Sequence, residues 1–119
     1  MENLTLQEET IMRHIWHLGK ATVKEVLHKC GEEAMPYTTL ASIVKNLERK
    51  GYVKGERVGI GFRYSPVIAE TDYKRSSLGQ MVSHYFAGSY RQMVNFFIEE
   101  QKLSKEELEE IIQMLETKK

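Results

Sequence analysis

The chain has 119 residues, with 17 basic and 17 acidic side chains and no formal net charge at pH 7. This length suits one compact domain of about 100 residues with an appendage. No apolar run approaches the roughly 20 residues that span a bilayer, and the first residues lack the pattern of a signal peptide, so we expect a cytoplasmic protein without membrane insertion. The single cysteine, Cys30, excludes an internal disulfide and a multi-cysteine metal site, and we expect it in the core.

Two capping boxes mark the starts of the first two predicted helices. Thr5 stands three residues before Glu8, and Thr22 three residues before Glu25. In such a pair the hydroxyl and the carboxylate satisfy free backbone N–H groups at the first turn. The apolar residues that follow recur at helical spacing, which predicts helices over about residues 6–18 and 22–30.

A third predicted helix, over residues 38–49, carries the side chains most suited to recognition. Leu40, Ile43, Val44 and Leu47 form its apolar face, and Gly51 should close it in the left-handed conformation. Hydroxyl, amide and cationic groups of the kind that hydrogen-bond base edges and phosphate oxygens occupy the opposite face. With the tyrosine that opens the stretch, the expected DNA-contacting residues here are Tyr37, Thr38, Thr39, Ser42, Lys45, Asn46 and Arg49.

From Tyr52 the pattern changes to a period of two, and glycines at 59 and 61 predict a hairpin whose second strand ends at Pro66. Three helices and a hairpin form a winged helix-turn-helix, with the third helix as the DNA reader. Residues 38–63 hold six basic and two acidic side chains, about +4, which indicates a surface for a polyanion. Lys54, Arg57 and Arg63 should meet phosphates in or beside the wing. The alternative is an ordinary helix and hairpin with a solvated polar face.

A helical second half is predicted over residues 69–117, with a break at Gly88 and a new start at the capping box of Ser104 and Glu107. Its large apolar residues present more apolar surface than an arm of about fifty residues can bury alone. Burial of this surface against an identical chain is therefore favoured. The alternative is a monomer in which these helices pack onto the winged helix. We therefore expect a mainly α fold with a small β-wing, divided into a DNA-binding domain over residues 1–67 and a dimerisation domain over residues 68–119. The expected dimer contacts are Leu78, Val82, Tyr85, Phe86, Met93, Val94, Phe97, Leu108, Ile111, Ile112 and Leu115.

Taken together, these segments resemble the penicillinase-repressor family that includes BlaI, MecI and CopY. The resemblance spans about residues 4–115. It implies a homodimeric repressor that occupies a palindromic operator in double-stranded DNA and blocks transcription. It rests on residues 6–12 with Ile15-Trp16, on Tyr37-Thr38-Thr39-Leu40 with residues 47–53, on residues 62–66, on Phe86-Ala87-Gly88-Ser89 and on Val94-Asn95-Phe96.

The resemblance also bears on the inducing signal. In beta-lactam-responsive members a membrane sensor-protease triggers cleavage at an Asn-Phe bond of the dimerisation region, which Asn95-Phe96 matches; an ordinary packed pair is the equal alternative. Copper-responsive members carry a cysteine-rich site near the C-terminus that this chain lacks, so no metal or cofactor is expected. Ala41 and Asn46 stand where arginines are expected, which implies different operator bases.

Two other classes of function remain open. A dimeric winged-helix module could bind a protein without binding an operator. For an enzyme, the only histidines are His14, His17, His28 and His84, and no nucleophile elbow, phosphate loop or paired-acid motif accompanies them, so no catalytic residue is expected.

Overall fold

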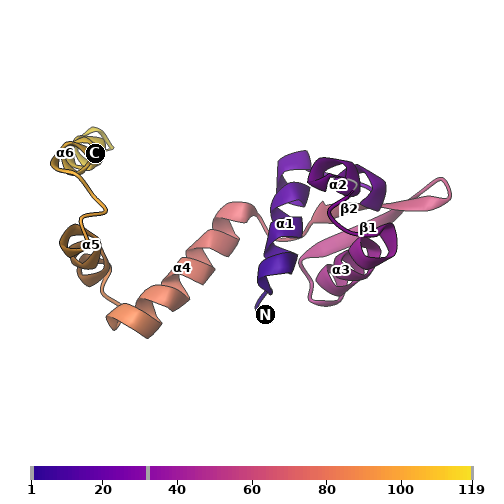
Figure 1. Ribbon diagram of the computed structural model, residues 1–119, viewed down its shortest axis with the longest axis horizontal. Coiled ribbons are helices and arrows are strands. Elements are labelled where there is room, and N and C mark those ends of the chain that lie inside the picture. Colours follow the sequence, from indigo (N-terminus) through magenta and orange to yellow (C-terminus); the bar gives the residue numbers. More distant parts are fainter. Residues whose placement is uncertain (1, 32, 119) are drawn as a thin grey trace. The chain divides into compact units, whose positions relative to one another are not determined.

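The computed structural model describes residues 2–31 and 33–118 (Figure 1). Met1, Glu32 and Lys119 lie outside the described residues. The chain divides into two compact units, residues 1–74 and 75–119, and the division falls within the fourth helix. The elements are α1 (Leu6–Leu18), α2 (Val23–Cys30), α3 (Tyr37–Arg49), β1 (Val53–Val58), β2 (Gly61–Pro66), α4 (Glu70–Phe86), α5 (Tyr90–Glu99) and α6 (Lys105–Thr117).

The predicted helix starts are confirmed. At α1, α2 and α6 the hydroxyl of Thr5, Thr22 or Ser104 accepts a hydrogen bond from the backbone of the third helical residue, whose carboxylate accepts one from the capping residue. Each such cap is worth about 1 kcal/mol. Gly51 follows α3 with φ of 88°, the left-handed conformation expected of it.

The core of the first unit lies between the three helices and the hairpin. Leu40, Val44 and Leu47 of α3 are buried there, and Ile43 packs against the same cluster, which confirms the predicted apolar face. The remaining buried apolar residues come from α1, α2, the two strands and the residues just before α2 and β1: Ile11, Met12, Ile15, Ala21, Val23, Val26, Tyr52, Val53 and Tyr64.

The beginning of α4 is fastened to α1 by aromatic side chains. The indole N–H of Trp16 donates to the carbonyl of Ile68 at 2.8 Å, and its ring lies 5.4 Å from that of Tyr73. The Tyr73 hydroxyl donates to a carboxylate oxygen of Glu9 at 2.6 Å. Trp16 therefore serves in packing, at the edge of the core.

The hairpin pairs β1 and β2 in an antiparallel register that places Gly55 opposite Tyr64 and Arg57 opposite Phe62. Ala21 extends the sheet by exchanging two backbone hydrogen bonds with Tyr64, at 2.9 and 2.8 Å. Cross-strand partners share a face of a sheet. Because Tyr64 is buried, its face is the one that meets the core.

The second unit buries few of its apolar side chains. Among its described residues only Val82 is buried, and neither α5 nor α6 has a buried residue. Ala87 and Gly88, with φ of 52° and 81°, end α4 at the predicted break. The rings of Phe86 and Phe96 then meet edge to face at 5.8 Å and connect α4 with α5.

Candidate nucleic-acid interface

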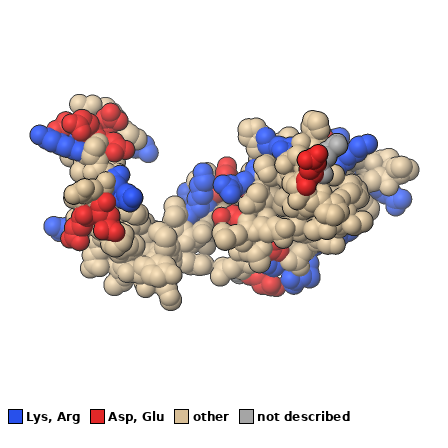
Figure 2. Space-filling model, in the orientation of Figure 1, with Lys and Arg blue, Asp and Glu red and all other residues tan. Residues whose placement is uncertain are grey.

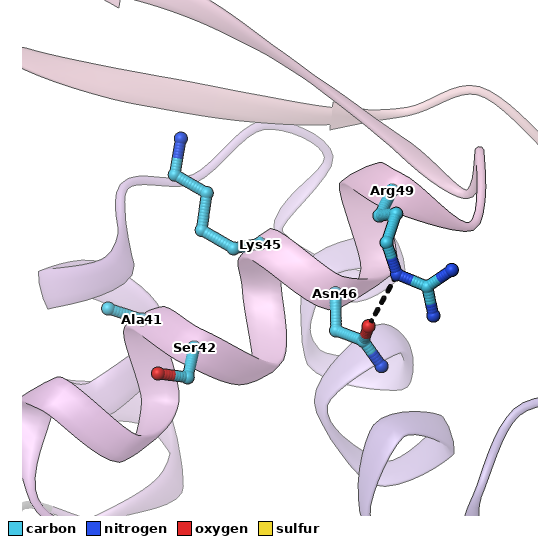
Figure 3. Close-up of a pocket in the computed structure, with 5 residues that line it drawn as sticks. All are labelled: Ala41, Ser42, Lys45, Asn46 and Arg49. Atoms are coloured by element: carbon cyan, nitrogen blue, oxygen red, sulfur yellow. Dashed lines mark hydrogen bonds between the residues drawn. The ribbon is translucent and has the colours of Figure 1, made fainter.

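The outward face of α3 carries a polar stripe. Thr38, Ser42, Lys45 and Arg49 follow one another at spacings of four, three and four residues, and all are exposed. This spacing keeps them on one side of the helix. Figure 3 shows Ser42, Lys45 and Arg49 along this outward face with Ala41 and Asn46 beside them, and the five residues line a shallow depression.

The first turn of α3 leaves its backbone N–H groups open to a ligand. Pro36 precedes the helix and gives no side-chain cap, and the first turn has no acidic residue. The exposed residues Tyr37, Thr38 and Thr39 surround this end. Uncapped N–H groups at a helix start favour anionic oxygen, and the two threonine hydroxyls can add further hydrogen bonds.

Lys45 joins the stripe to the wing. Its ammonium nitrogen lies 5.2 Å from the centre of the Phe62 ring on β2 and 3.7 Å from a carboxylate oxygen of Glu48. Its side chain is 63% exposed, so the charge remains available to a partner. In Figure 3 it projects from α3 toward the strands.

Asn46 is placed differently from the other members of the predicted set. It is half-buried, its amide NH₂ donates to Glu8 of α1, and its carbonyl oxygen accepts from Arg49 Nε at 3.0 Å, the bond drawn in Figure 3. Both of its functional groups are thus engaged within the protein.

The expected charge of this surface needs one correction. Lys50 is one of the six basic residues of this stretch, yet its side chain is only 8% exposed and its ammonium nitrogen lies 2.7 Å from a carboxylate oxygen of Glu8. Burial alone would raise the pKa of the Glu8 carboxyl, but hydrogen bonds from Lys50, the Thr5 backbone and Asn46, together with the Lys50 charge, lower that pKa to about 2. Lys50 therefore supports the fold and adds little to the surface potential.

The wing supplies exposed cations on two faces. Arg57 lies opposite Phe62, on the face that continues toward α3, whereas Lys54 and Arg63 lie on the other face of the hairpin. No described acidic residue forms an ion pair with any of the three. Figure 2 shows basic side chains on both sides of the hairpin tip. A duplex that meets this tip would find positive charge on either side.

Arg49 has an anionic neighbour already. Its guanidinium Nη1 lies 3.1 Å from a carboxylate oxygen of Glu2, and the two side chains are equally exposed, at 59%. Exposed pairs of this kind are worth about 0–1 kcal/mol, so a phosphate can replace the carboxylate at small cost.

Most residues expected to form a dimer interface remain accessible in the single chain. Leu78, Tyr85, Val94, Ile111, Ile112 and Leu115 are exposed, while Phe86, Met93, Phe97 and Leu108 are half-buried. Val82 is 1% exposed, so its side chain is already covered without a partner. Of the predicted cleavage pair, Asn95 and Phe96 are both exposed but lie in the middle of α5.

The part of the chain that the structure describes gives no sign of a metal centre or a membrane span. In residues 2–31 and 33–118 there is no cluster of three or more His, Cys, Asp or Glu suited to a metal ion. Over the same ranges, no helix combines the length and the apolar character needed to cross a bilayer.

Two residues that support the interface were not among those predicted. Glu8 was recognised only as a capping residue, although it also receives Lys50 and Asn46. Glu48 accepts a hydrogen bond from the Gly55 backbone at 3.1 Å and so ties α3 to β1. Glu48 stands in the sequence as an acidic residue within a predominantly basic stretch, and Glu8 is marked there by its capping box, so neither pattern indicates these contacts.

Comparison with known proteins connects this geometry to a family. A sequence profile described as penicillinase repressor matches residues 4–117. The chain is 28% identical to the penicillinase repressor of Bacillus licheniformis over 94% of this chain and 88% of the relative. It is 23% identical to the methicillin resistance regulatory protein MecI of Staphylococcus aureus, over 99% of this chain and all of that protein.

The fold has a relative among solved structures. MarR from E. coli, in its oxidised form, matches with a TM-score of 0.50 and 11% identity, over 97% of this chain and 75% of that one. This likeness concerns the winged-helix fold, which the helix order and the hairpin described above share. The family match covers nearly the whole chain, from the first helix to the last, so this chain belongs to the penicillinase repressor family of winged-helix, DNA-binding repressors.

Proposed function

We propose that this protein is a homodimeric repressor that binds a palindromic operator in double-stranded DNA. In each subunit α3 enters the major groove, with Thr38, Thr39, Ser42 and Lys45 near base edges. Arg49 at the end of α3 and Lys54, Arg57 and Arg63 in the wing contact phosphates.

The observation that carries this proposal is the combination of the open polar stripe on α3 with the exposed cations of the wing. The stripe residues are exposed, whereas Leu40, Val44 and Leu47 on the opposite face of the same helix are buried. None of the wing cations forms an ion pair with an acidic residue that the structure describes, although Arg63 lies across the hairpin from Glu56. Such a surface suits a polyanion that offers both hydrogen-bonding edges and phosphates.

The second unit supports the dimer. Ile112 and Leu115 on α6 are 53% and 62% exposed, so the described part of a single chain leaves much of both side chains in water. A second copy would bury them at a gain of about 25 cal/mol per Å² of apolar area. A two-fold pair also holds two copies of α3 about one helical turn of DNA apart, roughly 10 base pairs.

Acidic residues of the second unit favour keeping it away from the duplex. Residues 95–119 contain seven glutamates and four lysines, a net charge of about −3. Figure 2 shows acidic side chains gathered over α5 and α6. Such a surface is repelled by phosphates and suits protein contacts.

Cleavage between Asn95 and Phe96 is the proposed route of release. The bond lies within α5, and Phe96 contacts the rings of Phe86 and Phe97. A protease requires an extended chain, so α5 must unwind locally before the cut. Cleavage would separate α6 from α4, and loss of the dimer would weaken binding because the second half-site is no longer tethered. A membrane sensor-protease is the partner that this route requires.

The experiment that tests the function is selection of duplexes from a random-sequence library by the purified full chain. The selected sequences should contain an inverted repeat. The variant with Lys45→Glu and Arg49→Glu should select none, because both substitutions reverse charge on the reading face. The control substitution Lys105→Glu, at the start of α6, reverses a charge in the second unit and should leave selection intact. A wild-type protein that selects no duplex, yet forms a dimer, would favour the protein-binding module.

A further inference from the structure

Asn46 stands between a buried carboxylate and an exposed guanidinium. Its NH₂ group donates to Glu8 Oε2, and its carbonyl oxygen accepts from Arg49 Nε at 3.0 Å. Only one orientation of the amide satisfies both neighbours, since a carboxylate can only accept here and a guanidinium can only donate. The orientation of Asn46 is therefore set by the protein.

Glu8 is a fixed end of this chain of hydrogen bonds. It is 5% exposed, and its other oxygen accepts from Lys50 Nζ at 2.7 Å and from the Thr5 backbone N–H at 2.9 Å. These donors come from α3's C-terminal cap and from the start of α1, so the carboxylate cannot rotate without losing several bonds. It offers Asn46 an acceptor in a constant position.

Arg49 is the exposed end. With Nε held by Asn46, the planar guanidinium keeps a fixed direction and presents its terminal nitrogens at the surface. One of them, Nη1, already binds a carboxylate oxygen of Glu2. That contact shows the kind of group that suits this position, an anionic oxygen that a DNA phosphate can also supply.

We infer that Asn46 is a positioning residue that orients Arg49 for DNA, with Glu8 as its anchor, and that Asn46 does not itself read a base. The inference rests on the proposed DNA-binding function and specifies how one of its contacts is prepared. An arginine ordered before binding loses less conformational entropy when it meets a phosphate, so its contact contributes more affinity.

The first test is a double-mutant cycle on DNA affinity. The probe is the duplex that the wild-type protein selects from a random library, and the variants are Asn46→Ala, Arg49→Ala and the double variant. Asn46→Ala should weaken binding about fivefold in the wild-type background and less than about twofold in the Arg49→Ala background. An equal loss in both backgrounds would show that Asn46 contacts DNA independently, which overturns the inference. Ser42→Ala is the control, because Ser42 lies on the same face and has no side-chain partner among the described residues. It should reduce DNA affinity by the same factor in both backgrounds.

The second test needs no DNA. Nitrogen relaxation of the arginine Nε–H groups in the free protein should show Arg49 ordered in the wild type and mobile in Asn46→Ala, with Arg57 as a mobile reference. If Arg49 in the wild type is as mobile as Arg57, Asn46 does not orient Arg49, and the inference is overturned even if DNA binding is normal. Failure of the wild type to bind any duplex would instead overturn the proposed function. Thermal unfolding of Asn46→Ala confirms that the variant is folded under the conditions used.

Discussion

The Glu48 carboxylate of α3 accepts a hydrogen bond from the backbone N–H of Gly55 on β1, at 3.1 Å. The same carboxylate lies 3.7 Å from Lys45, which in turn contacts the Phe62 ring of β2. Side chains thus connect α3 and the wing at two points along the hairpin. Their relative orientation, on which the proposed contact with a groove and its phosphates depends, is fixed within one subunit.

This connection predicts a specific cost for Gly55→Ala. A Cβ atom at position 55 would lie 2.8 Å from Tyr64 Cε1 and 3.0 Å from Glu48 Oε2, and Tyr64 is buried and cannot move freely. We expect a loss of about 1–3 kcal/mol in the free energy of unfolding, measured by urea denaturation. Gly61→Ala is the matched control, because no atom lies within 4 Å of its added Cβ. Equal stability of the two variants would contradict the packing described here.

The lowered pKa of Glu8 predicts that the free energy of unfolding falls at acid pH. Its pKa is lowered from 4.5 to about 2 in the folded state, so its contribution is present above pH 4.5 and is lost as the pH falls through about 2. At about 1.4 kcal/mol per pKa unit the contribution is of the order of 3 kcal/mol. Glu8→Gln should therefore be less stable at neutral pH and should lose less stability than the wild type between pH 4.5 and 2. Parallel pH profiles of the two proteins in urea denaturation would refute this role for Glu8.

The wing cations predict the salt dependence of DNA binding. Each phosphate contact contributes about 0.9 to the slope of log affinity against log salt concentration. Arg57→Ala should reduce that slope by about 1, because its charge has no acidic partner among the described residues. Lys102→Ala, in the acidic second unit, should leave the slope unchanged. A slope unaffected by Arg57→Ala would remove the wing from the DNA-binding surface.

The exposed apolar face of α6 predicts a matched pair of dimer variants. Ile112→Lys places a charge in the proposed interface, whereas Gln113→Lys adds the same charge at the next, polar position of the helix. Light scattering coupled to size exclusion should find Ile112→Lys monomeric and Gln113→Lys dimeric. A dimeric Ile112→Lys protein would place the interface elsewhere.

Much of the fold could be predicted from the sequence because its signals are local. Thr5 and Glu8 are three residues apart, and the hydrogen bonds of a capping box depend on nothing else. The same holds for the left-handed Gly51 after α3 and for the change to a period of two that precedes the hairpin.

The roles of Asn46 and Lys50 could not be predicted in this way, because they depend on a partner far away in the chain. Glu8 lies 38 residues before Asn46 and 42 before Lys50. At the end of α3, Arg49 and Lys50 are neighbouring cations, and the sequence alone does not distinguish which of the two side chains is buried. Only the packing of α1 against α3 decides that Lys50 is buried with Glu8 while Arg49 remains at the surface.

The most direct test of the central claim is hydroxyl-radical footprinting of the wild-type protein on its selected duplex, repeated over a series of salt concentrations. The account predicts two protected half-sites with centres roughly 10 base pairs apart, and protection that weakens steeply as salt increases. A duplex carrying one half-site should be bound much more weakly. A single protected patch, or protection that does not change with salt, would contradict the claim that a dimer reads a palindrome through α3 and the wing.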